Sequence, residues 1–411
     1  MTHSMTAEKT MDAGWSNLRD LPAAFQSSLK LLKQNWRRGT LTFVLPNGRE
    51  IHVSGFEPGP DARIEVRDYR FVRRVLSSGD IGFCEGYMAG EWDTPNLAAV
   101  LEVFSLNLDR LRRLLAGGPV MRFINALIHM GNANSREGSK RNIYAHYDLG
   151  NAFYSSWLDE SMTYSSALFE TPDQPLSAAQ RNKYAALARS MDLQAGHSVL
   201  EIGCGWGGFA EFAAREVGAQ VTGITISPAQ FDYAQARMAK AGLSDKVTIR
   251  LVDYRDVTGQ FDRIASIEMF EAVGEAYWPV YFDKVRSLLK PDGQAGLQII
   301  TIDDALFETY RKRSDFIQKY IFPGGMLPSP SKLEAVTRKS GLEIAGQQAF
   351  GLHYAETLKI WAEQFSQAWA NGQITGFDES FRRLWLFYLA YCEAGFRTKR
   401  TDVVQISLKP A

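Results

Sequence analysis

A run of glycines after a short apolar segment constrains this chain more than any other feature. Residues 199–208, Val-Leu-Glu-Ile-Gly-Cys-Gly-Trp-Gly-Gly, predict a buried strand, a tight turn and the start of a helix. Glycine is needed where the backbone turns sharply against a ligand, because a Cβ would clash there. Gly203, Gly205 and Gly208 satisfy the pattern G-x-G-x-x-G, a weak signal that many nucleotide-type ligands share. A nicotinamide dinucleotide is disfavoured, because the next predicted strand, 220–226, has no acidic residue for the ribose.

The composition excludes several classes of protein. The chain has 411 residues, 45% hydrophobic and 22% charged, so a sizeable core and two domains are expected. Its 46 basic and 46 acidic residues give no net charge, so we expect no nucleic-acid partner. Three cysteines without paired spacing argue against a disulfide framework and a metal site. Since no signal peptide or membrane-spanning run is found, we expect a cytoplasmic protein that reaches any membrane from its inner face, peripherally.

Two regions of different character predict the domain organisation. Residues 1–125 are expected to form an α+β domain with a hairpin at Pro46-Asn-Gly48 and helices over 72–76 and 97–115. Residues 126–145 are the expected linker, and 146–411 form a second domain in which strands and helices alternate. That alternation predicts a mostly parallel sheet with helices on both faces. The strands are expected at 199–202, 221–226, 247–251, 261–267 and 294–300, with a late edge strand at 403–408.

Polar residues follow each of the first four strands of this predicted sheet. After the glycine turn come the segments 225–230, 253–255 and 268–274, which supply hydroxyl, amide and carboxyl groups. Each segment alone is equally well explained as a helix cap or a solvated loop. Ligands of such sheets bind beyond the carboxyl ends of the strands, so their joint occurrence predicts one binding site there.

Several motifs in a fixed order make a family resemblance specific. They are His146-Tyr-Asp-Leu-Gly-Asn151, Met162-Thr-Tyr-Ser-Ser-Ala-Leu-Phe169, the glycine motif, Gly223-Ile-Thr-Ile-Ser227, Asp253-Tyr-Arg255, Phe270-Glu-Ala-Val-Gly274 and Lys319-Tyr-Ile-Phe-Pro-Gly-Gly325. Together with Gly82-Phe-Cys-Glu-Gly-Tyr-Met-Ala-Gly-Glu-Trp-Asp93, they resemble the cyclopropane-fatty-acyl-phospholipid synthase family. The resemblance runs from about Tyr144 to the end and rests on many spaced motifs.

The resemblance implies a fold, a cofactor and partners. The fold is α/β, a Rossmann-like class I methyltransferase with a mostly parallel seven-stranded sheet, and a smaller N-terminal α+β domain assists lipid engagement and dimer formation. The cofactor is S-adenosylmethionine (SAM), and the partner is a phospholipid membrane surface. Glu201 precedes the glycines where class I SAM methyltransferases resemble one another. The matching cofactor-binding positions are Tyr164, Ser165, Glu201, Gly203, Gly205, Trp206, Gly207, Thr225, Ile226, Ser227, Gln230, Asp253 and Tyr254.

The implied reaction is transfer of the SAM methyl group to a cis double bond of a phospholipid acyl chain, followed by proton loss and ring closure. An alkene needs no deprotonation, so positioning supplies much of the rate. The resulting carbocation must be kept from water and stabilised by negative charge or aromatic faces. In the family a bound bicarbonate takes the proton, held by a Cys, a Glu, a His, a main-chain position and a Tyr. The matching positions here are Ser166, Glu271, Gln298, Ile300 and Tyr354, and Ala272 stands where the family has a His after the Glu. The three departures, Ser166, Ala272 and Gln298, resemble the plant-type branch of the family.

The departures from this set raise a second hypothesis for the base. Ser166 and Gln298 carry no charge, so Glu271 or Glu268 is a candidate to take the proton directly. On a helical turn their spacing would put both carboxylates on one side, and two nearby carboxylates raise the pKa of one. The alternative is that Glu268 caps a helix or faces solvent. Cys392 matches a family cysteine, but a small buried hydrophobe is the simpler reading.

Three rival functions stay open at this point. If the base removes a different proton from the carbocation, the product is a methylene- or methyl-branched chain instead of a ring. Some alkaloid N-methyltransferases resemble this family, which makes N-methylation of a small molecule a second rival. A non-catalytic lipid-binding protein is the third, and the intact glycine turn and Asp253 speak against it.

Overall fold

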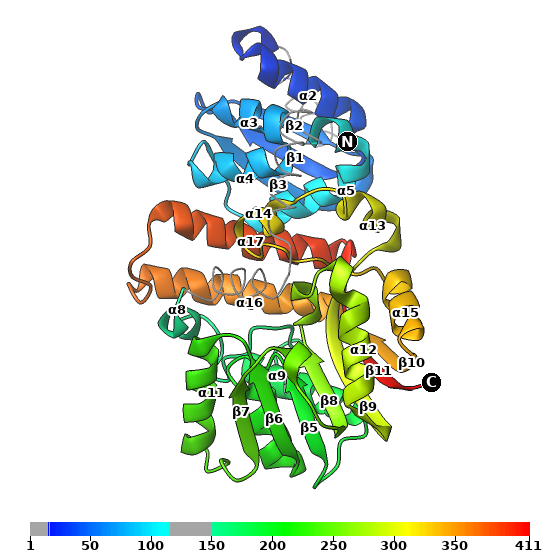
Figure 1. Ribbon diagram of the computed structural model, residues 1–411. Coiled ribbons are helices and arrows are strands. Elements are labelled where there is room, and N and C mark those ends of the chain that lie inside the picture. Colours follow the sequence, from blue (N-terminus) through cyan, green and yellow to red (C-terminus); the bar gives the residue numbers. More distant parts are fainter. Residues whose placement is uncertain (1–14, 16, 116–148) are drawn as a thin grey trace. The chain divides into compact units, whose positions relative to one another are not determined.

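Figure 1 shows the computed structural model, which describes residue 15 and residues 17–115 and 149–411. The chain divides into two compact units. The small unit contains the described residues up to 115, with Arg313–Phe316 and Thr375–Thr398. The large unit contains residues 149–312, Ile317–Ile374 and Lys399–Ala411.

The large unit is built on a seven-stranded sheet with the order β10-β11-β9-β8-β5-β6-β7. Its strands are β5 (Ser198–Ile202), β6 (Gln220–Thr225), β7 (Val247–Leu251), β8 (Phe261–Ile267), β9 (Leu289–Ile302), β10 (Leu342–Ala349) and β11 (Thr401–Pro410). Strands β5 to β9 pair in parallel, whereas β11 runs antiparallel to both neighbours. The predicted α/β fold is confirmed, and the carboxyl ends of β5 to β8 meet at one edge of the sheet.

Helices alternate with these strands along the chain. They are α8 (Asn151–Ser155), α9 (Leu176–Ser190), α10 (Gly208–Phe212), α11 (Pro228–Lys240), α12 (Trp278–Leu288), α13 (Asp304–Tyr310), α14 (Phe316–Tyr320), α15 (Pro330–Lys339) and α16 (Gly351–Ala370). Short 3₁₀ turns lie at Tyr254–Asp256, Phe270–Ala272 and Glu275–Tyr277. The helix predicted after the glycines is α10, which continues as a π-helical turn over Ala213–Val217.

Each face of the sheet carries its own apolar core. On one face α9, α10 and α11 pack with Val199 of β5 and Ala265 of β8. On the other face α12 and α15 pack with the next residue of β5, Leu200, and with Ile264 of β8. Successive strand residues point to opposite faces, so a strand covered on both sides needs a continuous apolar run. This explains why adjacent residues of these strands, Val199-Leu200 and Ile264-Ala265, are all apolar.

The last strand differs from its prediction. The sequence predicts an edge strand over 403–408, but β11 lies between β9 and β10. The edge strand is β10, which the sequence analysis missed. Most of β10 after Leu342 is exposed, and its pairing is irregular between Ile344 and Gly346. An exposed edge strand can carry polar residues, so its sequence lacks the alternation of apolar and polar residues by which a strand is predicted.

The small unit contains a four-stranded sheet with the order β2-β1-β3-β4. Its elements are a 3₁₀ turn (Leu18–Asp20), α2 (Ala23–Asn35), β1 (Arg38–Val44), β2 (Glu50–Ser54), β3 (Glu57–Val66), α3 (Arg70–Ser78), α4 (Asp80–Met88), β4 (Trp92–Asp93), α5 (Leu97–Leu115) and α17 (Glu379–Arg397). The predicted hairpin is confirmed as the antiparallel pair β1 and β2, and the two predicted helices are α3 and α5. The parallel pairing of β1 with β3 is not anticipated by the sequence.

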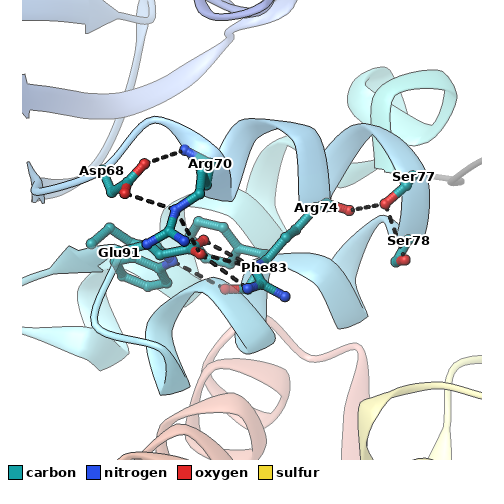
Figure 2. Close-up of polar contacts among 8 residues, drawn as sticks. Asp68, Arg70, Arg74, Ser77, Ser78, Phe83 and Glu91 are labelled. Carbon is teal, nitrogen blue, oxygen red and sulfur yellow. Dashed lines mark hydrogen bonds and ion pairs between the residues drawn. The ribbon is translucent and has the colours of Figure 1, made fainter.

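A buried ion pair organises the segment that contains the motif 82–93. Figure 2 shows Glu91 beside Arg70 and Arg74 of α3. Glu91 is only 2% exposed, and its carboxylate accepts hydrogen bonds from Nε and Nη2 of Arg74 at 2.9 and 3.0 Å. Trp92 Nε1 donates to the carbonyl of Phe83 at 3.0 Å. These contacts tie α3, α4 and β4 together, so the motif has a structural role in this unit.

Helix α17 belongs to the small unit although it lies near the end of the chain. Arg383 donates to the carbonyl of Trp92 at 2.8 Å and pairs with Asp93 at 3.3 Å. Its guanidinium also lies 4.0 Å from the centroid of the Tyr87 ring. The predicted second domain, 146–411, contains two segments that cluster with the small unit, Arg313–Phe316 and Thr375–Thr398. The predicted linker, 126–145, lies outside the described residues.

Candidate active site

The glycine turn leaves the end of β5 and enters α10. Gly203, Gly205 and Gly207 have φ angles of 81°, 53° and 85°, in the left-handed region that favours glycine. A Cβ on Gly205 would meet no described atom within 4 Å, so space opens beside the backbone at this residue. A Cβ on Gly203 would lie 2.6 Å from the Met269 side chain. The turn therefore presents open backbone at the sheet edge where ligands of such folds bind.

Glu201 places a buried carboxyl group directly before this turn. It is 3% exposed, and its Oε2 atom has no hydrogen-bond partner among the described residues. Burial raises the pKa of Glu201 to about 8, against the opposing charges of Lys183 and Arg237. A buried polar atom without a partner is costly, so such an atom in a native protein calls for a ligand or water. The atom fits a hydroxyl or amine of a nucleoside-type ligand.

The loops after β6 and β7 bring further predicted residues to the same edge. Thr225 Oγ1 donates to Gln230 Oε1 at 2.9 Å and accepts the Ser227 backbone N–H at 3.1 Å. Asp253 is buried, and its carboxylate accepts Nε and Nη2 of Arg255 at 2.9 and 2.6 Å. A ligand at Asp253 would thus share that carboxylate with an arginine, which the sequence analysis did not foresee. The other two predicted residues of these loops, Ile226 and Tyr254, are half-buried.

The carboxylate of Glu268 is the centre of a hydrogen-bond network beyond β8. Its Oε1 accepts the Ser166 backbone N–H at 2.9 Å and Gln298 Nε2 at 2.7 Å. Its Oε2 accepts the Tyr354 hydroxyl at 2.6 Å. Burial raises the pKa of Glu268, partly opposed by the charge of Lys183 and by these donors. The alternative that Glu268 caps a helix or faces solvent is therefore not what the structure shows.

Glu271 lies beside Glu268 and has a different environment. Its Oε1 accepts the backbone N–H of Ile300 at 2.5 Å, and its Oε2 has no hydrogen-bond partner among the described residues. Burial, and next the charge of Glu268, raises its pKa to about 8. The sequence predicts both carboxylates on one helical turn, but Glu268 precedes the 3₁₀ turn that contains Glu271 and has a left-handed φ of 49°. The two groups nevertheless interact, as their spacing predicts.

Lys183 is a functional candidate that the sequence analysis missed. It lies on α9, is fully buried, and its Nζ donates to Ser165 Oγ at 2.6 Å. Burial lowers its pKa to about 8, while the charges of Glu268, Asp159 and Glu201 oppose this shift. The lysine thus stands between the carboxyl group at the glycine turn and the carboxylate beyond β8. The signal in the sequence is its spacing with Ala179, Tyr184 and Leu187, which puts Lys183 on the buried face of α9, where a lysine without a partner is rare.

Aromatic rings form a continuous series from the glycine turn to Tyr354. Trp206 contacts Tyr154, with 5.1 Å between ring centroids, and Tyr154 contacts Tyr164 at 5.4 Å. Tyr164 contacts Trp361 of α16 at 5.3 Å, and Trp361 contacts Tyr354 at 6.1 Å. Buried aromatic rings exclude water, and the face of such a ring attracts a cation that comes within about 6 Å of its centroid. Tyr154 and Trp361 were not predicted as site residues.

The predicted site residues gather in one unit, with one exception. All of those named above as catalytic or cofactor-binding lie in the large unit apart from Cys392, which is on α17 of the small unit. The structure therefore brings a glycine turn, a carboxylate pair and an aromatic wall to one edge of one sheet.

The chain is similar over most of its length to proteins of one family. Residues 134–406 match the family model described as Mycolic acid cyclopropane synthetase. The chain is 42% identical over 389 residues to the tuberculostearic acid methyltransferase UfaA1 of Mycobacterium tuberculosis, covering 92% of this chain and 90% of that protein. It is 35% identical over 376 residues to the cyclopropane-fatty-acyl-phospholipid synthase of Escherichia coli K12, covering 90% and 93%. The crystal structure of mycolic acid cyclopropane synthase CmaA1 with SAH and CTAB has a TM-score of 0.62 and 31% identity, covering 66% of this chain and 97% of that one.

The chain belongs to the cyclopropane-fatty-acyl-phospholipid synthase family. It is therefore a SAM-dependent fatty acyl methyltransferase, and the rival of a non-catalytic lipid-binding protein falls away. SAM is its cofactor, in agreement with the SAH in the related CmaA1 structure. The open turn at Gly205 and the unpaired Glu201 oxygen fit such a ligand. Among the residues that the structure describes, no helix is long and apolar enough to cross a membrane.

Proposed function

We propose that this enzyme transfers the methyl group of SAM to the cis double bond of a phospholipid-bound unsaturated acyl chain and forms a cyclopropane ring. The observation that carries the proposal is the pair Glu268 and Glu271, set beyond β8 at the same sheet edge as the glycine turn. Methyl transfer to an alkene leaves a carbocation, which needs negative charge nearby and a proton acceptor after the transfer. The family membership and the 35% identity to a cyclopropane synthase support it.

The proposed reaction consists of methyl transfer, proton loss and ring closure. The π electrons of the double bond form a carbon–carbon bond to the methyl group, the carbon–sulfur bond breaks, and S-adenosylhomocysteine leaves. The positive charge then lies on the neighbouring chain carbon. A carboxylate takes one proton from the new methyl group, and the freed electron pair closes the three-membered ring.

We assign the cofactor and the cation to two groups of residues. The turn at Gly203 to Gly207 with Glu201, and the loops with Thr225 and Asp253, hold SAM in this proposal. The aromatic wall keeps water away from the cation, since a water molecule would otherwise capture it as an alcohol. The unpaired Oε2 of Glu271 supplies negative charge toward the cation, and its raised pKa reflects how poorly that charge is solvated.

A second product is favoured by one specific observation, the 42% identity to a methyl-branching enzyme across 92% of the chain. The two products share the methyl transfer and the proton that is lost. If a hydride first moves from the methylated carbon to its cationic neighbour, loss of the same methyl proton gives an exocyclic methylene group. A slower base gives the hydride more time to move, so the strength and position of the base decide the product.

The deciding experiment incubates the protein with SAM and vesicles of a cis-unsaturated phospholipid, and analyses the acyl chains by mass spectrometry and proton NMR. A mass gain of one CH₂ group with upfield ring protons supports the cyclopropane product. The same gain with vinylic methylene protons supports the branched product. No gain, with SAM bound, would overturn acyl methylation as proposed here and turn attention to amine substrates.

The proposal includes where the enzyme works and how it assembles. The enzyme works at the inner face of a membrane, as a cytoplasmic and peripheral protein, because an acyl chain must leave the bilayer to enter the site. The small unit assists lipid engagement and homodimer formation. Sedimentation with the same vesicles and light scattering of the free protein test these two points separately.

A further inference from the structure

Three donors from three separate segments converge on the carboxylate of Glu268. They are the Ser166 backbone N–H before α9, Gln298 Nε2 on β9 and the Tyr354 hydroxyl on α16. An ionised carboxylate can accept about four hydrogen bonds, two on each oxygen. Both positions on Oε1 and one position on Oε2 are occupied, so one position on Oε2 is left. Such a group is held in a fixed orientation with a single lone pair available for a proton.

The backbone at Glu268 is itself strained to reach this position. Its φ angle is 49°, left-handed for a residue with a Cβ, which costs about 1–2 kcal/mol. The Glu268 N–H donates to the Gln298 carbonyl at 2.8 Å, so the same two residues are joined twice. Strain of this kind persists where the surroundings over-determine it, and it gathers at functional sites.

The donors that hold Glu268 occupy the positions that the family resemblance assigns to a bound bicarbonate. Ser166, Gln298 and Tyr354 take the places of the Cys, the His and the Tyr of that set, and all three bind Glu268 here. The main-chain position of the set, Ile300, donates its N–H to Glu271. Each of these four positions thus already donates one hydrogen bond to a carboxylate of the chain.

We infer that Glu268 is the proton acceptor of the reaction and replaces an exchangeable bicarbonate ion. This inference rests on the proposed methyl transfer to an acyl double bond. The proton moves from the new methyl group to Oε2 of Glu268, and the electron pair of the broken C–H bond forms the ring or the methylene double bond. Lys183, which is buried and donates to Ser165, provides the compensating positive charge for the ionised form.

The test removes the carboxylate without removing its donors. Turnover of the wild-type protein is measured as S-adenosylhomocysteine release with phospholipid vesicles, in buffer freed of carbon dioxide and with added bicarbonate. The variant Glu268→Gly suits the left-handed backbone and leaves a space of carboxylate size beside Ser166, Gln298 and Tyr354. Its matched control is Glu268→Gln, which removes the charge but fills the same space.

We expect wild-type turnover to be the same with and without bicarbonate. Both variants should lose at least about a hundredfold in turnover, the usual contribution of a general base. Added bicarbonate or formate should restore Glu268→Gly in a saturable way and leave Glu268→Gln unchanged, because the amide blocks the space. SAM affinity should stay within about threefold in both variants, which shows that they are folded.

Two results would overturn the assignment of Glu268 while leaving the proposed function intact. One is an active wild-type protein that needs bicarbonate. The other is a Glu268→Gly variant that turns over within about threefold of the wild type in the carbon-dioxide-free buffer. A wild-type protein that binds SAM but modifies no acyl chain would instead overturn the proposed function.

Discussion

At the scale of single residues, the site is a set of buried charges that differ in how their hydrogen bonds are met. Glu268 has donors on both oxygens, whereas Glu201 and Glu271 each keep an oxygen without a partner among the described residues. A satisfied carboxylate is fixed in place, and an unsatisfied one is available to a ligand or a developing cation. By this difference we distinguish Glu268, which takes the proton, from Glu201, which faces the cofactor, and Glu271, which faces the carbocation.

Gly205→Ala tests the cofactor turn. The new Cβ would enter the open space beside the turn, where we place SAM, so SAM affinity should fall at least about tenfold, which is 1.4 kcal/mol. Isothermal titration calorimetry measures it. Gly196→Ala is the matched control, because Gly196 also has a left-handed φ, of 80°, and no neighbour within 4 Å, but precedes β5 at its other end. Equal losses in both variants would mean that backbone strain, not the ligand, is responsible.

Glu271→Gln tests the charge that faces the cation. The amide oxygen can still accept the Ile300 N–H, so turnover should fall about a hundredfold or more while SAM affinity changes little. In the wild type, turnover should rise as the pH increases through about 8, because the carboxyl group must ionise. Asp245→Asn, which removes an exposed carboxylate, is the control. Equal losses in turnover and SAM affinity would move Glu271 to the cofactor pocket.

Lys183→Met tests the buried lysine through a pH profile. Loss of the ammonium group removes a charge that lowers the pKa of Glu268, so that pKa should rise and less base should be ionised at neutral pH. Turnover at neutral pH should fall about tenfold or more, and recover in part at higher pH. A merely structural lysine would lower the thermal midpoint and leave the shape of the profile unchanged.

At the scale of elements, strands with an apolar pattern can be predicted from the sequence. Strands that form only by pairing with a distant segment cannot. The apolar runs of β5 and β8 are predictable because both faces of each strand are buried. Strand β10 is not, since its polar residues acquire strand geometry only by pairing with β11. The site shows the same division: Glu268 is a candidate from its spacing, but its donors at Ser166, Gln298 and Tyr354 come together only through the fold.

Gly82→Ala tests the contact between α3 and α4. The added Cβ would lie 2.0 Å from the carbonyl oxygen of Arg74, a backbone atom that cannot move without separating the helices. We expect a loss of about 3 kcal/mol in the free energy of unfolding, at the upper end for overpacking. Ser77→Ala removes a hydroxyl that donates to the same carbonyl and adds no atom, so it should cost under about 0.5 kcal/mol. Thermal denaturation compares the two, and equal midpoints would contradict the close packing.

At the scale of the whole molecule, the buried carboxyl groups make stability depend on pH. Glu201 and Glu271 have an ordinary pKa of 4.5 and a pKa of about 8 in the folded protein. Between these values the folded state binds more protons than the unfolded state, so the free energy of unfolding falls as the pH rises. Lys183 acts only above about 8, where its lowered pKa makes stability rise with pH. The pKa of Asp262 is held below 3.8 by Lys290, so its stabilising contribution is complete throughout the window.

The ligand-free protein should therefore be more stable at mildly acidic pH than near pH 8, with a slope of at most about 1.4 kcal/mol per pH unit for each carboxyl group. Thermal midpoints across this range measure the effect. The double variant Glu201→Gln with Glu271→Gln should flatten the slope, because neither amide titrates. A wild-type midpoint that rises with pH across this window would show that these carboxyl groups are ionised in the folded protein. That result would also remove the expected rise in turnover through about 8, since one ionisation governs both.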